Sequence, residues 1–379
     1  MNKDAAYWIA LAHLQRWGHL KINNLIIKFY HENKLTPEDF FQLSENDWKN
    51  QYGLEYMQVE DLKKAKSELV NNAFLAESLY NEGYELISII SPEYSKTLKE
   101  NLKAAHAPAL LYVKGNKQIM TEKSIAIVGS RNASDFSLQF TDNIAKLASK
   151  EYKVIVSGFA KGVDKQALDS AIKYRGQSII VLPQGIMTFG SGFKTYYKQI
   201  VDGDVLVLST FFPKAPWKAE LAMARNPIIY GLADEIYVAE SSDKGGTWSG
   251  VVDGLRKNRK IYVRKPETSE NTANLLLIDK GAIAVDFNGF PVIEAKPVAI
   301  QTTISLASEP EISYDNKIFE LLKTGEFAIK DIIKKLQLDW SEKKLRDYLK
   351  KQNDIETIIK KPLRFTLKDK VVKQKSLFD

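Results

Sequence analysis

Three short segments of this sequence combine glycine with basic or hydroxyl side chains, a combination suited to binding phosphate. Each follows a run of β-branched and aliphatic residues and precedes a helical pattern. Glycine lets a backbone approach an anion closely, the first N–H groups of a helix attract negative charge, and arginine offers a planar pair of donors. We therefore predict that the segments form one phosphate-binding rim. They are Gly129, Ser130 and Arg131; Ser157, Gly158, Lys161 and Gly162; and Lys244, Gly245, Gly246 and Thr247.

Further basic residues and one aromatic residue are candidates for the same rim. Trp248 follows the third segment directly and could give a base a surface for stacking, although packing in the core is an equally good interpretation. A solvated surface position is the simpler interpretation for each lysine on its own. The basic candidates are Lys194, Lys198, Lys214, Lys218 and Arg225.

Catalytic and metal chemistry finds little support in the residue types. All four histidines precede the first glycine segment, so none is available near the rim as a base or a metal ligand. With no cysteine, a thiolate site is excluded. Asp164 begins a helical pattern and suits N-capping, which leaves Glu240 and Asp243 as the remaining carboxylate pair. We expect no enzyme activity and no metal.

A dinucleotide cofactor is also not expected. No GxGxxG fingerprint occurs, and the second predicted strand of the core ends in Ser157-Gly158, where an acidic residue would bind a ribose. We therefore expect the chain to bind no cofactor.

The elements that position these loops alternate between short apolar runs and amphipathic helical stretches. Runs that are apolar throughout indicate strands buried on both faces, hence a parallel sheet between helices. The predicted fold class is α/β, an extended Rossmann-like parallel sheet core at residues 81–290. The predicted strands are 85–90, 109–115, 124–130, 153–158, 177–183, 204–210, 234–241 and 260–266.

The segments on either side of this core differ from it in pattern. Residues 1–80 show helical periodicity and helix-start signals at Thr36-Pro37 and Ser44, so we predict an N-terminal helical domain. Residues 291–312 contain several prolines and predict a linker. Residues 313–379 predict three helices and a hairpin, the pattern of a winged-helix domain.

Length and composition are those of a globular protein of two or three domains. The chain has 379 residues, is 44% hydrophobic, and has no apolar run long enough to cross a membrane. The lack of cysteine suits a reducing, cytoplasmic setting. The net charge is +7, and residues 313–379 hold 17 basic against 11 acidic residues, an excess of 6. This asymmetry favours a polyanion as partner, with a merely solvated surface as the alternative.

The order of the motifs resembles that of a known family. The stretches SIAIVGSR (124–131), VIVSGFAKGVDKQAL (154–168), SIIVLPQGI (178–186) and ARNPIIYGLADEIYVAES (224–241) are similar to the DNA-processing protein A family, also called DprA or Smf. The resemblance covers about residues 80–285. Glycine-serine-arginine after one strand and serine-glycine after the next are the hallmarks of that family.

The resemblance implies a non-enzymatic protein that binds single-stranded DNA, forms homodimers and hands the DNA to the RecA recombinase in transformation or recombination. It implies that Arg131 and Lys194 contact the DNA backbone. It also implies an N-terminal domain of SAM or helix-hairpin type and a C-terminal winged helix. That winged helix could bind duplex DNA or another protein, and both alternatives stay open. The basic residues of its expected recognition helix are Lys343, Lys344, Arg346, Lys350 and Lys351.

Several positions depart from the family pattern. Leu168 stands where the family has a histidine, Pro227 replaces an arginine after Arg225-Asn226, and Arg264-Lys265 replaces a proline-glycine pair. A second hypothesis is therefore a nucleotide-ligand sensor or nucleotide-processing protein of the wider Rossmann superfamily, with phage defence as one setting. The segment 245–247 is similar to the glycine-threonine phosphate loop of phosphoribohydrolases in that superfamily.

Overall fold

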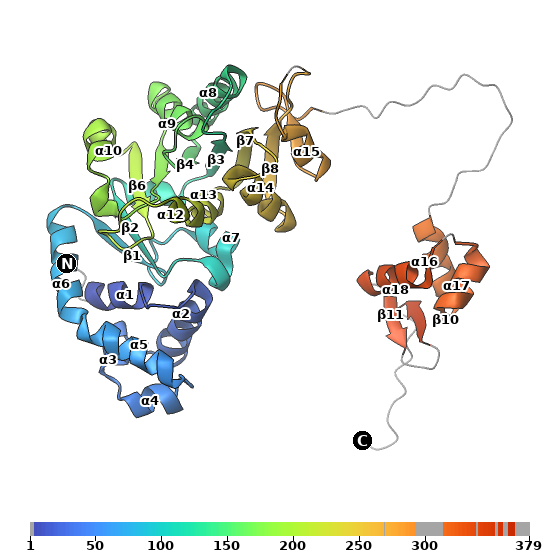
Figure 1. Ribbon diagram of the computed structural model, residues 1–379, viewed down its shortest axis with the longest axis horizontal. Coiled ribbons are helices and arrows are strands. Elements are labelled where there is room, and N and C mark those ends of the chain that lie inside the picture. Colours follow the sequence, from blue (N-terminus) through green and yellow to red (C-terminus); the bar gives the residue numbers. More distant parts are fainter. Residues whose placement is uncertain are drawn as a thin grey trace. The chain divides into compact units, whose positions relative to one another are not determined.

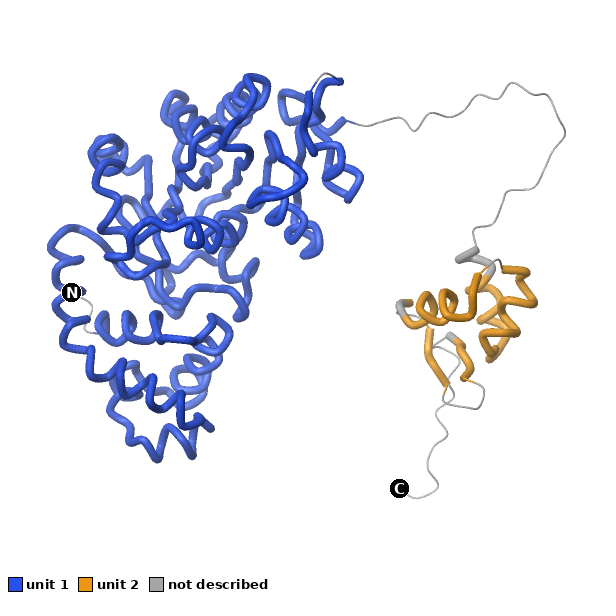
Figure 2. Tube along the Cα trace, viewed as in Figure 1, with its two compact units in different colours: residues 1–295 blue, residues 296–379 orange. Residues whose placement is uncertain are grey.

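The computed structural model describes residues 4–268, 270–292, 314–338, 340–352, 355–358 and 363–367. The chain divides into two compact units, residues 1–295 and 296–379 (Figure 2). The linker predicted at 291–312 lies outside the described residues from 293 onward. Within the described part of the chain, no helix has the length and apolar character needed to cross a membrane.

A nine-stranded sheet forms the centre of the first unit (Figure 1). Its order is β1-β2-β6-β5-β4-β3-β7-β8-β9. All eight predicted strands are confirmed, and β9 is an additional short strand that the sequence pattern did not reveal. The strands are β1 (Glu85–Ser88), β2 (Leu110–Lys114), β3 (Ser124–Gly129), β4 (Val154–Ser157), β5 (Ser178–Val181), β6 (Val205–Ser209), β7 (Glu235–Glu240), β8 (Lys260–Arg264) and β9 (Ile283–Val285).

The sheet is mostly, but not wholly, parallel. The seven strands from β6 to β9 in the sheet order pair in parallel, whereas β2 pairs antiparallel with both β1 and β6. The expectation of an all-parallel sheet was therefore wrong at this edge. Apolar runs alone do not distinguish the two kinds of pairing when both faces are buried.

Helices bury both faces of the sheet, which explains why its strands are apolar throughout. Ile125 and Ile127 of β3 pack under α8 and α9, while Ala126 and Val128 face the opposite core with α13 and α14. The helices of this region are α7 (Lys96–His106), η2 (Lys117–Thr121), α8 (Asp135–Lys150), α9 (Val163–Lys173), η3 (Ile186–Thr188), α10 (Gly190–Thr195), α11 (Tyr197–Val201), α12 (Ala219–Ala224), α13 (Asn226–Leu232), α14 (Gly246–Arg256) and α15 (Asn274–Asp279).

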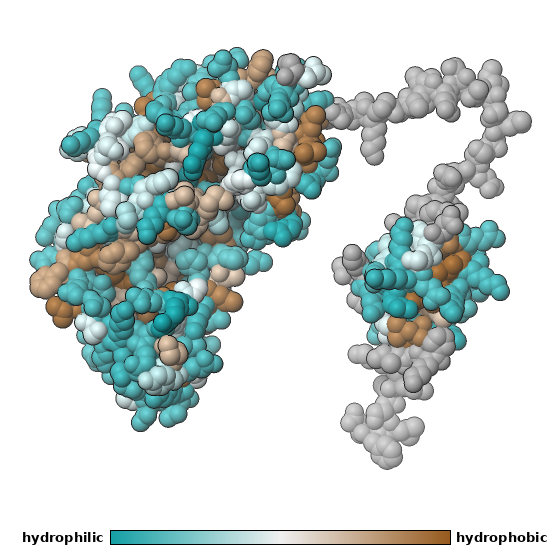
Figure 3. Space-filling model, in the orientation of Figure 1, coloured by the Kyte–Doolittle hydropathy of each residue, from teal (hydrophilic) through white to brown (hydrophobic). Residues whose placement is uncertain are grey.

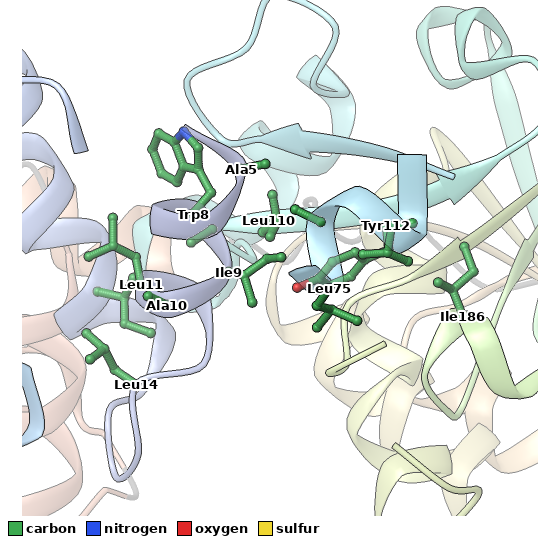
Figure 4. Packing of buried hydrophobic residues seen from close by; sticks show 14 of the residues in the cluster. Ala5, Trp8, Ile9, Ala10, Leu11, Leu14, Leu75, Leu110, Tyr112 and Ile186 are labelled. Carbon is green, nitrogen blue, oxygen red and sulfur yellow. The ribbon is translucent and has the colours of Figure 1, made fainter. Parts of the chain in front are cut away.

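The N-terminal residues are helical, as predicted, and share a hydrophobic core with the sheet. Ile9 and Leu75 belong to the same buried cluster as Leu110 and Tyr112 of β2, and Figure 4 shows side chains of the first helix facing this cluster. The boundary expected at residue 80 therefore coincides with no break in packing. The helices are α1 (Ala5–Ala12), α2 (His19–Ile26), the π-helix η1 (Ile27–Glu32), α3 (Pro37–Gln42), α4 (Glu45–Asn50), α5 (Tyr56–Ser67) and α6 (Leu69–Asn81).

Both predicted helix starts in this region are confirmed as capping boxes. The Thr36 and Ser44 hydroxyls accept the N–H groups of Asp39 and Asp47, whose carboxylates accept the N–H groups of the caps in return. Such reciprocal bonds satisfy two otherwise free donors at each helix start.

The second unit has its own small core, which includes Ile332, Leu345, Leu349 and Phe365. Its three strands have the order β10-β12-β11. The winged-helix assignment stays a prediction. The elements are α16 (Tyr314–Thr324), β10 (Phe327–Ala328), α17 (Ile329–Leu336), α18 (Glu342–Lys351), β11 (Ile355–Ile358) and β12 (Arg364–Leu367).

Candidate anion-binding site at the centre of the sheet

The strand order reverses next to β3, and a cleft lies at that point. The chain proceeds from β3 to β4, β5 and β6 on one side, and β7 and β8 continue on the other. In open α/β sheets such a reversal leaves a crevice beyond the carboxyl ends of the strands. Here the cleft measures about 380 Å³ and is lined by the loops after β3 and β7, by Ala160 and by the α12–α13 segment.

The first glycine segment reaches this cleft, but its helix does not offer free N–H groups. Gly129, Ser130 and Arg131 all line the cleft, and Arg131 is exposed with no ion pair to another described residue. The start of α8, however, is occupied by Glu240. Its Oε2 accepts the N–H of Ser134 at 3.0 Å and the hydroxyls of Ser134 and Ser137 at 2.7 Å each. The expected anion site at the start of α8 is therefore filled by the chain's own carboxylate.

Glu240 thus has a structural task. This placement disfavours the catalytic role considered for the pair of Glu240 and Asp243, because the Glu240 carboxylate is engaged by Ser134, the N-cap of α8, and by Ser137. Across the described residues, no group of three or more histidine, aspartate or glutamate side chains is arranged to hold a metal ion.

The second glycine segment is also used internally. The backbone N–H groups of Gly158 and Ala160 donate to the carboxylate of Asp164, so they are not free for a phosphate. A Cβ on Gly158 would lie 1.2 Å from Nη1 of Arg225. Glycine is therefore needed at this position because the Arg225 guanidinium occupies the space of a side chain. The Ser157 hydroxyl is buried and donates to the Ile127 carbonyl at 3.4 Å. These internal bonds disfavour direct phosphate binding by Ser157 and Gly158, which stays a prediction.

The remaining members of the second segment differ in position. Gly162 has φ +75°, and a Cβ there would meet the carbonyl of Ser130 at 2.3 Å. Glycine is therefore required for the second loop to pack against the first. Lys161 is exposed and precedes Gly162, but it is not part of the cleft lining.

Arg225 lies buried at the cleft rather than exposed on the rim. Its side chain is 4% exposed, and Nη2 lies 3.5 Å from Oδ2 of Asp164. Its Nε and Nη1 have no hydrogen-bond partner among the described residues. Burial raises the pKa of Asp164, although Arg225 opposes this shift, and burial lowers the pKa of Arg225, with Arg131 adding to the lowering. With both groups charged the pair is neutral overall, and Arg225 is close enough to Arg131 for the two guanidinium groups to repel each other.

The third glycine segment leaves its backbone open. Lys244, Gly245, Gly246 and Thr247 all line the cleft. Gly245 has φ +90°, a Cβ added there would meet nothing within 4 Å, and no side chain caps α14. The Thr247 hydroxyl donates to the Gly129 carbonyl at 3.2 Å, which ties the first segment to the third. The free N–H groups at the start of α14 are thus the strongest anion-binding feature of the cleft.

Other candidates lie outside the cleft lining. Lys194 on α10 and Lys198 on α11 are exposed but do not line it. Trp248 packs against the core beside α13, so the core-packing interpretation is the better one. Lys214 and Lys218 are exposed on the segment between β6 and α12, next to Trp217, which is 54% exposed.

Sequence reasoning missed several residues of the cleft. Asn226, Tyr230 and Met223 all line it, and Tyr230 is buried with a raised pKa caused by burial and by Asp164. The helical spacing of 223, 226 and 230 puts them on one face of the α12–α13 segment. That spacing was visible in the sequence, but nothing in it showed that this face turns toward β3.

Arg264, which departs from the family pattern, is also explained. It is fully buried at the end of β8 and binds Glu270 through both terminal nitrogens, at 2.6 and 2.7 Å, while Nε donates to the Ala239 carbonyl. Arg264 lowers the pKa of Glu270. The departure therefore builds an ion pair behind the cleft.

A sequence model described as DNA recombination-mediator protein A matches residues 85–292, more than half of the chain. The chain belongs to this family. The DNA processing protein DprA of Streptococcus pneumoniae is 32% identical over 157 residues, which span 41% of this chain and 55% of that protein. Its counterpart in Bacillus subtilis is 27% identical over 208 residues, spanning 54% and 69%. Protein Smf of Synechocystis is 25% identical over 295 residues, spanning 74% and 70%.

The fold of the recombination-mediator family is also found by structure comparison. The crystal structure of DNA processing protein A from Streptococcus pneumoniae covers 74% of this chain and 93% of its own, with a TM-score of 0.60 and 24% identity. This likeness shows the fold, a mixed α/β architecture with a large, mostly parallel sheet.

Proposed function

We propose that this recombination-mediator family protein binds single-stranded DNA along the edge of the sheet where the cleft opens. The observation that carries the proposal is the pairing of exposed Arg131 and Lys244 with the uncapped start of α14 in one cleft. Phosphate charge supplies most of the affinity of such sites. The two carboxylates that line the cleft, Asp164 and Glu240, are held in internal contacts.

The segment between β6 and α12 extends this surface. It carries the exposed rings of Phe212 and Trp217 and the exposed cations Lys214 and Lys218. Its far end meets the cleft at Ala219. Aromatic rings interleaved with cations suit an unpaired strand, because every base has a face for stacking.

The experiment is a salt titration of binding to a labelled single strand. Arg131→Glu should weaken binding by at least about ten-fold and make the salt dependence shallower, because a phosphate contact is lost. The matched control is Arg256→Glu, an exposed arginine at the opposite end of α14. Unchanged affinity in Arg131→Glu would contradict the proposal.

The finer parts of the proposal concern partners and the second unit. The protein acts without catalysis, as a homodimer that loads RecA recombinase on DNA in transformation or recombination, and the second unit is a winged helix that binds duplex DNA. The description of the matching family as a recombination mediator supports the role in recombination, and the basic residues of α18 support duplex binding. Light scattering tests the dimer, and a RecA filament-nucleation assay on coated single strands tests the loading.

A nucleotide-ligand sensor or nucleotide-processing protein is the second candidate. It is favoured by the size of the cleft, about 380 Å³, and by the open backbone at Gly245. Thermal stabilisation by mononucleotides that is lost in Arg131→Glu, without any binding of single strands, would favour it. Release of free base from a nucleoside monophosphate would show processing and contradict the non-enzymatic assignment.

A further inference from the structure

A second cavity lies away from the glycine segments, between the N-terminal helices and the segment after β6. It measures about 570 Å³ and is lined by residues of α1, α5 and α6 together with Phe212 and Lys214. A volume of this size is typical of small-molecule sites. On the face drawn in Figure 3, apolar residues gather in a band across the first unit between more polar surfaces.

Part of the cavity wall is apolar. Ile9, Leu14 and Leu75 supply aliphatic surface, and Figure 4 shows Ile9 and Leu75 close to Tyr112. His13 packs edge-on against Phe212, with ring centroids 5.4 Å apart. Because Phe212 is still 39% exposed, part of its ring is available to a ligand. Such walls favour a planar, uncharged ring system.

One amide of the chain is accessible from the cavity, and no contact among the described residues uses it. Asn72 is only 9% exposed and lines the cavity, yet its side chain forms no hydrogen bond to another described residue. Its neighbour Asn71 differs, because Nδ2 of Asn71 donates to Glu68 at 2.6 Å. An accessible amide that forms no internal hydrogen bond can donate and accept at once, so a ligand edge that also donates and accepts would be well matched to Asn72. The Watson–Crick and Hoogsteen edges of bases have this pattern.

Two cations and two carboxylates lie at the same cavity. The carboxylates of Asp61 and Glu68 are engaged by Arg16 and Asn71. Lys64 donates to Oε1 of Gln15 at 3.2 Å, and Lys214 forms no ion pair with another described residue. Lys214 and Phe212 belong to the segment between β6 and α12, whose other end meets the cleft beside β3. The chain segment between β6 and α12 thus contributes both to the cavity and to the surface proposed to bind DNA.

We propose that this cavity binds a nucleobase. The ring lies between the apolar walls and Phe212, its polar edge meets the amide of Asn72, and an attached phosphate lies toward Lys214. The base can come from a free nucleotide or from a bound strand. Only the second source rests on the proposed function, so the experiment has one arm for each.

The test uses the full chain and the fluorescence of 2-aminopurine, which is quenched when the base stacks. One arm titrates the free 2-aminopurine nucleotide, and the other titrates a single strand that contains one 2-aminopurine. We expect saturable quenching in at least one arm. In that arm Phe212→Ala and Asn72→Leu should each weaken binding by about ten-fold. If Asn72→Leu does not unfold cooperatively, the nearly isosteric variant Asn72→Asp is tested in its place.

The matched control is Phe290→Ala, which removes a 60% exposed ring outside the cavity lining and should leave quenching unchanged. Quenching by the free nucleotide should survive Arg131→Glu, whereas strand binding should not. This difference separates a failure at the cavity from a failure of the DNA proposal. The inference is overturned if 2-aminopurine fluorescence saturates in neither arm. It is also overturned if Phe212→Ala and Asn72→Asp bind 2-aminopurine as tightly as the parent, or if Arg131→Glu alone abolishes quenching of the free nucleotide.

Discussion

Individual charged residues in this protein have roles that depend on burial. Arg131 is exposed and free for a ligand, whereas Arg225 is 4% exposed and lies beside Asp164. The same guanidinium group thus serves as a ligand contact at one position and as a buried counter-charge at the other. A buried pair of this kind is far more sensitive to the loss of one member than an exposed pair.

Asp164→Asn should destabilise the protein strongly. It leaves the buried Arg225 guanidinium without its counter-charge, and the expected loss in the free energy of unfolding is about 3 kcal/mol. Denaturant unfolding measures it. The control is Lys165→Met, which removes an exposed partner of Asp169 and should change stability by about 0.5 kcal/mol or less. Equal effects of the two substitutions would show that the buried pair is not needed.

His13 should make stability depend on pH. Burial, with a smaller contribution from His19, lowers its pKa to about 4 from the ordinary 6.5. As the pH falls, the unfolded chain takes up the proton first. The stabilisation is therefore complete above pH 6.5, is lost between pH 6.5 and about 4, and amounts to about 3 kcal/mol. His13→Gln cannot take up this proton, so its unfolding free energy should fall less over the same range. Parallel pH profiles of parent and variant would contradict the assignment.

Helix starts are the elements that decide where an anion can bind. α8 and α14 both begin beside the cleft, yet Ser134, itself bound by Glu240, caps α8 while no side chain caps α14. α9 carries Asp164 in its first turn. Of the three helices that follow glycine segments, α14 is thus the one with neither a side-chain cap nor an acidic residue in its first turn.

Glu240→Gln should have opposite effects on stability and on DNA affinity. The charge-assisted bonds to Ser134 and Ser137 weaken, which should cost about 1 kcal/mol in the free energy of unfolding. Loss of a negative charge from the cleft should at the same time tighten binding of a single strand by about two-fold. Thermal unfolding and a binding titration on the same preparation measure both. Weaker DNA binding would instead place Glu240 among the ligand contacts.

At the scale of the whole molecule, the two units have separate cores. The clusters that contain the sheet lie within residues 1–295, and Ile332, Leu345 and Phe365 form a core within the second unit. The basic excess of residues 313–379 belongs to the second unit. We therefore expect the first unit to supply most of the affinity for single strands and the second unit most of the affinity for duplex DNA.

Ending the chain after residue 295 should leave the binding of single strands within about two-fold of the full protein, because the cleft is intact. Duplex binding should weaken by about ten-fold, because the basic second unit is removed. A comparison of both affinities at one salt concentration, with circular dichroism as a control for folding, measures this. A parallel loss of both affinities would mean that the second unit supports one common site.

Much of the fold followed from local pattern. Apolar runs predicted all eight strands, and glycine with basic residues after those strands predicted that residues 129–131 and 244–247 meet at one edge. These features are readable because the periodicity of a segment and the backbone freedom of glycine are properties of neighbouring residues. The short strand β9 escaped because it has only three residues, too few for a strand period to be recognised, although the residues 282–285 are all apolar.

Only the tertiary structure decided which donors of the site are free. Glu240 reaches Ser134 across 106 positions because β7 lies beside β3, and Arg225 reaches Asp164 across 61 positions for a similar reason. The sequence by itself therefore determined the elements and the chemistry of the loops. The partners of each carboxylate and guanidinium depended on which strands and helices became neighbours, and electrostatic pairing acts through space, not along the chain.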